Sequence, residues 1–203
     1  MGARSQPSPQ RARLAYEAAR ILAEQGDQAF DHARRKAALR IGVINRRDWP
    51  TNEEIQAALL EQRRLFEPER LGSELRRLRT QAAAAMGVFA KFRPRLVGSA
   101  LSGPGDLRQG VRLYLFADSP EEVVFVLCDQ HIPWHEREEP LRFGGGVRRF
   151  LPAFSFVAGD IPFTLVVLPI QAMSNPPLDS VTDRPERGAD LEAVRRLLGE
   201  PGT

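Results

Sequence analysis

The chain has 203 residues, of which 42% are hydrophobic and 27% are charged, an ordinary composition for a folded protein. No apolar run reaches the roughly 20 residues that a membrane span needs, and no apolar segment before Leu14 could act as a secretory signal. The single cysteine, Cys128, excludes an intrachain disulfide. We therefore expect a cytoplasmic protein without a membrane partner.

Charge is distributed unevenly along the chain. Residues 1–97 contain 19 Lys and Arg against 11 Asp and Glu, whereas residues 98–203 contain 10 against 15. A basic half favours phosphate-bearing partners, because arginines bind phosphates and concentrate polyanions. The arginines are interleaved with glutamates, however, as on a solvated helix face. Trp49 and Trp134 are expected to be packing residues and not platforms on which bases stack. Nucleic-acid binding through the basic helices is therefore kept only as an alternative.

Apolar residues recur at helical spacing through the first part of the chain. Four segments carry such a stripe, at 14–22, 30–41, 55–66 and 68–89. Thr51 or Asn52 can cap the third helix, because Glu53 and Glu54 then lie in its first turn, where the helix dipole favours anions. These helices form the first predicted domain, a basic helical module over residues 1–93.

Strand-like runs replace the helical pattern near residue 93. Five strands are predicted, at 96–100, 111–117, 132–138, 148–158 and 161–168. The segment Asp118-Ser119-Pro120 is typical of a helix start, and the helix should extend to about Gln130. A proline-rich connection then leads to a last helix capped by Asp190. The predicted fold class is α+β, with the helical module followed by an α/β domain with a small mixed sheet at 94–203.

A Gly-Ser pair follows the first predicted strand and opens the most specific pattern in the chain. After Gly98-Ser99 come a turn glycine, Gly103, and the strand-opening triplet Gly110-Val111-Arg112. This spacing resembles the Gly-Ser signature of the DNA polymerase β-type nucleotidyltransferase superfamily, where the triplet is acid-apolar-acid. The whole chain also resembles an uncharacterised group of bacterial proteins with a helical N-terminal region and a degenerate domain of this type.

The resemblance implies three metal-binding acids, and this chain has none of them. Gly110 and Arg112 stand at the first two positions, and Thr164 stands at the third, on a later strand. Mg²⁺ needs carboxylate oxygens, and a guanidinium would repel the cation and attract phosphate. We therefore expect no cofactor and no catalytic residues. The expectation is a nucleotidyltransferase-like pseudoenzyme that acts by binding or regulation, through an anion or a protein partner.

The same resemblance implies an anion site that needs no metal. Ser99 would contact a nucleotide or phosphate through its hydroxyl and the neighbouring amides. Gly98, Ser99 and Arg112 are therefore predicted to form this site, with Arg108 of the same loop as a further phosphate contact. Each also has a simpler interpretation, as a turn serine that satisfies local backbone or as a solvated surface arginine.

Two other site hypotheses remain from the sequence. A working metal-dependent nucleotidyltransferase would have to use other carboxylates, such as Asp118 or Asp160. Cys128, His131 and His135 carry zinc-ligand chemistry, but they supply only three ligands and straddle a helix-to-strand turn. Neither hypothesis is favoured over the anion site.

Overall fold

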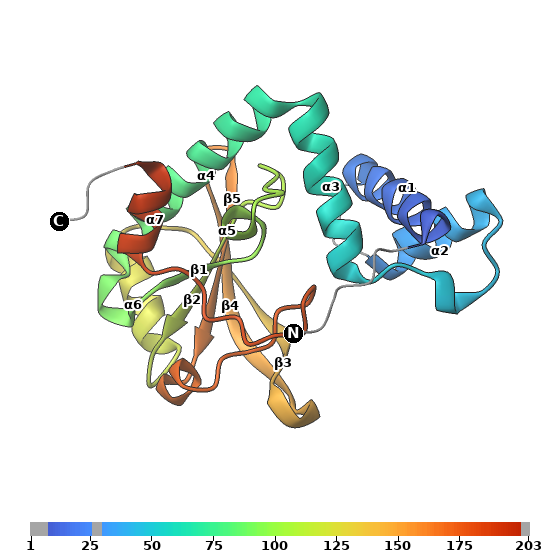
Figure 1. Cartoon of the computed structure of the whole chain (residues 1–203). Coiled ribbons are helices and arrows are strands. Elements are labelled where there is room, and N and C mark those ends of the chain that lie inside the picture. The colour runs from blue at the N-terminus through green and yellow to red at the C-terminus, as the bar shows by residue number, and fades with distance from the viewer. Residues whose placement is uncertain (1–7, 26–29, 200–203) are drawn as a thin grey trace. The chain divides into compact units, whose positions relative to one another are not determined.

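The computed structural model describes residues 8–25 and 30–199. These residues form seven α-helices and a five-stranded mixed sheet (Figure 1), which confirms the predicted α+β class. No helix within them is long and apolar enough to cross a membrane. The polar start of the chain, on which the expectation of no secretory signal partly rests, lies outside the described residues. The chain divides into two compact units, Met1–Pro68 and Glu69–Thr203.

The first unit contains α1 (Pro9–Gln25), α2 (Phe30–Ile41) and α3 (Asn52–Phe66). Its core is rich in alanine, which lets the helices approach closely. The fully buried side chains are those of Leu14, Ala18, Ala19, Ile21, Ala33, Ala37 and Ile55. Thr51 caps α3 as predicted, in a reciprocal capping box with Glu54.

Helix α4 (Pro68–Val88) continues the helical pattern of the sequence but packs with the second unit. Leu78, Ala82 and Met86 are fully buried and belong to the same apolar cluster as the sheet residues. The compact units therefore divide after Pro68. The predicted boundary at residue 93 follows local periodicity, which does not show what a helix packs against.

The second unit is built on one sheet with the strand order β1-β2-β5-β4-β3. The strands are β1 (Arg95–Val97), β2 (Val111–Phe116), β3 (His135–Arg142), β4 (Arg148–Ala158) and β5 (Ile161–Leu168). Neighbouring strands are antiparallel except for β2 and β5, which are parallel. The sheet is therefore mixed, as predicted.

Two strands differ from their predicted positions. The first ends at Val97 rather than at residue 100, because Gly98 turns the backbone with φ +73° and the next residues form the short helix α5 (Ser99–Ser102). The third begins at His135 rather than at residue 132. The chain leaves helix α6 (Glu121–Asp129) through His131, whose φ of +54° delays the extended conformation.

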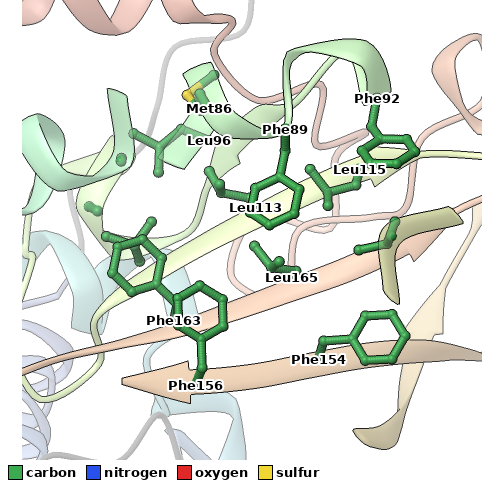
Figure 2. Packing of buried hydrophobic residues seen from close by; sticks show 14 of the residues in the cluster. Met86, Phe89, Phe92, Leu96, Leu113, Leu115, Phe154, Phe156, Phe163 and Leu165 are labelled. Carbon is green, nitrogen blue, oxygen red and sulfur yellow. The ribbon is translucent and has the colours of Figure 1, made fainter. Parts of the chain in front are cut away.

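The two faces of the sheet differ in cover. One face packs against α4, α6 and α7 (Leu191–Leu198) and forms the main core; Figure 2 shows its leucines and phenylalanines. Phe156 and Phe163 stack in this core with ring centroids 5.1 Å apart. The other face carries Arg112, Tyr114 and Phe116 of β2, and we call it the Arg112 face. A smaller apolar cluster on it includes Ala172 of the segment that follows β5.

Candidate functional site

Two of the four predicted anion-site residues, Gly98 and Arg112, lie next to each other beside the Arg112 face. Val97 pairs with Arg112 across β1 and β2, and a Cβ added to Gly98 would lie 3.9 Å from Cδ of Arg112. Ser99 begins α5, is buried, and accepts a hydrogen bond from the Gly103 N–H at its backbone carbonyl. Gly98 and Arg112 are therefore neighbours, and Ser99 follows Gly98 at the start of α5.

The fourth predicted residue, Arg108, is paired with the carboxylate of Asp106 in its own loop. Its guanidinium donates to both carboxylate oxygens of Asp106, at 2.8 and 3.0 Å to Oδ2 and 3.3 Å to Oδ1. This hydrogen-bonded pairing with Asp106 raises the pKa of Arg108, and the charges of Arg70 and Glu74 on α4 also act on it. The Arg108 guanidinium is therefore already bound to a carboxylate of its own loop.

Arg112 is paired with a carboxylate from the far edge of the sheet. Its Nη1 lies 2.5 Å from Oε1 of Glu139 on β3, and the two side chains are only 26% and 21% exposed. Burial lowers the pKa of Arg112, but its interactions with Tyr114 and with the Glu139 carboxylate, including the hydrogen bond to Glu139, outweigh burial and hold the pKa above its usual value. Arg112 is therefore a permanent cation with an internal anion bound to it.

A second carboxylate occupies the Gly-Ser turn. Glu186 accepts hydrogen bonds from the Gly98 N–H at 3.1 Å and from the Tyr114 hydroxyl at 2.8 Å. Burial raises the pKa of Glu186, and the two hydrogen bonds oppose that shift. The Gly98 amide, which the sequence offered for an anion, thus already binds one.

Glu186 reaches this position through a backbone contact that only glycine allows. Leu96 and Ala189 exchange two backbone hydrogen bonds, at 2.8 and 2.9 Å. Gly188, which lies between Glu186 and Ala189 in the sequence, has φ +65°, and a Cβ there would lie 2.7 Å from the Leu96 carbonyl oxygen. Glycine at 188 therefore lets the connection lie against β1 and brings Glu186 to the turn.

Thr164 lies directly beside Arg112. The two residues are register partners on the parallel strands β2 and β5, and Arg137 of β3 donates to the Thr164 hydroxyl at 3.2 Å. Arg137 also lies 3.7 Å from Oε2 of Glu139, a buried oxygen that accepts no hydrogen bond. Two arginines therefore flank one carboxylate that is incompletely hydrogen-bonded. We call Arg112, Arg137, Glu139 and Thr164 the polar cluster.

The residues at the three acid positions do not fit a divalent cation. Gly110 has φ +67°, and a Cβ there would lie 1.9 Å from the backbone oxygen of Pro162, so an aspartate cannot stand at that position without moving β5. Arg112 brings a positive charge, and Thr164 offers one hydroxyl that already accepts from Arg137. Hard cations need several oxygen ligands, so metal-assisted phosphoryl transfer has no support at these positions.

The alternative metal sites find no support either. Asp160, in the turn between β4 and β5, forms an ion pair with Arg77 of α4, and Cys128 is an exposed free thiol. Within the described ranges, no three His, Cys, Asp or Glu side chains are grouped so that they could hold a metal ion.

Some residues of the site were missed from the sequence. Arg137 and Glu139 alternate on an edge strand, a pattern that indicates a shared face but not a partner on β2. Glu186 lies in an irregular segment without any local signal. Arg79 of α4 donates to the carbonyls of Ala100 and Leu101 at 3.0 and 3.4 Å, and burial lowers its pKa. It holds the turn that follows Ser99.

No model of a protein family matches the chain, and no match was found among curated proteins or among solved structures.

Proposed function

We propose that the second unit is a non-catalytic, nucleotidyltransferase-like domain that binds a nucleotide or phosphate without metal, with Arg112 as the principal contact. The Arg112–Glu139 pair supports this proposal best. It occurs where the resemblance expects a metal-binding acid, and it contains a half-buried guanidinium that already holds an oxyanion. A phosphate would replace Glu139 on Arg112, with Gly98 and Ser99 at the side of the incoming group.

Exchange of one anion for another keeps the charge of Arg112 compensated. A half-buried guanidinium without a partner would carry a large desolvation penalty, and Glu139 removes that penalty in the free protein. Arg137 lies beside both Glu139 and Thr164, so the displaced Glu139 would keep one cationic neighbour. A phosphate gains two charge-assisted hydrogen bonds from a guanidinium, and this gain is what favours the exchange.

The test is calorimetric titration of the full chain with ATP in EDTA and again in Mg²⁺. We expect binding in EDTA and a loss of at least about tenfold in affinity, about 1.4 kcal/mol, in Arg112→Gln. Arg148→Gln is the matched control, because Arg148 is exposed in the β3–β4 hairpin and loses the same charge. Binding that requires Mg²⁺, or equal affinity in Arg112→Gln and the wild type, would overturn the proposal.

A further inference from the structure

A second basic site lies in the first unit, between α2 and the loop that precedes α3. The cavity has a volume of about 440 Å³, which is within the range of small-molecule sites. Its lining residues are Asp31, Arg34, Arg35, Arg46, Trp49 and Pro50. Three guanidinium groups therefore line the cavity together with one carboxylate.

Arg34 and Asp31 compensate each other. Arg34 donates to Asp31 at 2.6 Å and to the Pro50 carbonyl at 2.8 Å, and it also donates to the side chain of Asn52. Its side chain is 15% exposed, whereas that of Asp31 is 79% exposed. Arg34 thus joins α2 to the start of α3, and its charge is matched by Asp31. The other two arginines are left to supply net positive charge.

Arg35 and Arg46 have no carboxylate partner among the residues that the structure describes. Both side chains are exposed. The guanidinium carbon of Arg46 lies 5.5 Å from the centroid of the Trp49 ring, and Trp49 is itself held by a 3.4 Å hydrogen bond from Nε1 to the Val43 carbonyl. Stacking on an aromatic face orders a guanidinium and leaves its N–H groups available at the edge. The Trp49 ring therefore holds the Arg46 guanidinium in a position from which its N–H groups can donate to a hydrogen-bond acceptor of a ligand.

We infer that this cavity binds a phosphate group, either of a free phosphate compound or of a nucleic-acid backbone. Two guanidinium groups that have no carboxylate partner within residues 8–25 and 30–199 match the charge and the several acceptor oxygens of a phosphate, whereas a single carboxylate would leave one of them unneutralised. The cavity volume also leaves space for groups attached to the phosphate. The inference is independent of the Arg112 site, because every residue that carries it belongs to the first unit.

The experiment uses the full-length Trp134→Phe protein, in which Trp49 is the remaining tryptophan. Inorganic pyrophosphate is titrated by Trp49 fluorescence, and a fluorescein-labelled oligouridine of roughly 12 nucleotides is titrated by anisotropy. We expect Arg35→Gln and Arg46→Gln each to weaken binding by about fivefold or more. Arg13→Gln should change it less than about twofold, because Arg13 is exposed on α1 and does not line the cavity.

The two probes distinguish the source of the phosphate. Pyrophosphate binding without tighter RNA binding identifies a free phosphate ligand, and tighter RNA binding that falls steeply with added salt identifies a nucleic acid. Either result supports the inference if it depends on Arg35 and Arg46. Failure of both probes to bind, or equal losses in Arg13→Gln and Arg46→Gln, would overturn it. Arg112→Gln should leave the Trp49 titration unchanged, which separates this test from that of the second unit.

Discussion

Gly110 shows how a single residue excludes a metal-binding acid from the position where the sequence resemblance expects one. Its backbone has φ +67° and lies against the Pro162 carbonyl, so the close approach of β2 and β5 depends on the absence of a side chain. We expect Gly110→Ala to lower the free energy of unfolding by about 2 to 5 kcal/mol, from backbone strain and overpacking. Urea unfolding measures this loss. Gly144→Ala, at a glycine with open space and an ordinary φ, is the control, and equal stabilities of the two variants would refute the argument.

The burial of Glu186 predicts that the folding stability of the protein depends on pH. Burial raises its pKa, so between the usual carboxyl pKa and the raised one the unfolded chain loses the proton that the folded chain keeps. Folding stability therefore falls as pH rises through that interval. Glu186→Gln cannot titrate, and its unfolding free energy relative to the wild type should increase as the pH rises from about 4 through the raised pKa of Glu186. Exposed Glu138 provides the control Glu138→Gln. A parallel pH profile for wild type and Glu186→Gln would contradict the burial argument.

The sequence predicted local features of the site residues but not their partners. Gly98 and Arg112 lie side by side because Val97 and Arg112 pair across β1 and β2, and the anion site that their spacing predicts stays a prediction. The spacing did not predict that Glu139 binds Arg112 and that Glu186 binds the Gly98 amide, since these contacts cross 27 and 88 residues. Arg108 is close to the site in sequence, but its guanidinium pairs with Asp106 of the same loop, a contact that the spacing from Gly98 did not predict.

At the scale of the elements, caps and turns set the ends that position the site. Asp190 begins α7 by accepting from the Ala193 N–H at 2.8 Å and from Arg95 at 3.1 Å; the Ala193 hydrogen bond and Arg95 lower the pKa of Asp190. Asp190→Ala should lower the free energy of unfolding by about 1 to 2 kcal/mol at neutral pH. Asp190→Asn keeps the capping oxygen and should lose clearly less. Thermal or urea unfolding of the pair checks this, and equal losses would show that the cap is unimportant.

The elements were predicted well where a strong cap or helix start marks them, as at Thr51 and Pro120. The errors occurred where a positive φ interrupts an apolar run. Gly98 ended the first strand early and His131 delayed the third, and neither backbone angle follows from hydrophobic pattern. The packing of α4 on the sheet was also not predictable. An apolar stripe shows that one face of a helix is buried, but it does not show which element covers that face.

At the scale of the whole molecule, the division after Pro68 predicts two units that respond separately to core mutations. Each unit contains one tryptophan, Trp49 or Trp134, so single-tryptophan variants report on each unit in the full chain. Leu78→Ala, at a fully buried position of the second unit, should destabilise that unit by about 3 kcal/mol. The urea midpoint seen by Trp134 should fall while that seen by Trp49 stays. A common shift of both midpoints would mean that the units unfold together.

In the proposed site, Glu139 holds the place of an external anion on Arg112. The most direct measurement is calorimetric titration of ATP in EDTA into the wild type and into Glu139→Gln. Removal of the competing carboxylate charge should tighten binding by about threefold to tenfold, although the protein itself loses an ion pair. Unchanged or weaker binding in Glu139→Gln would contradict the claim and would identify the Arg112–Glu139 pair as purely structural.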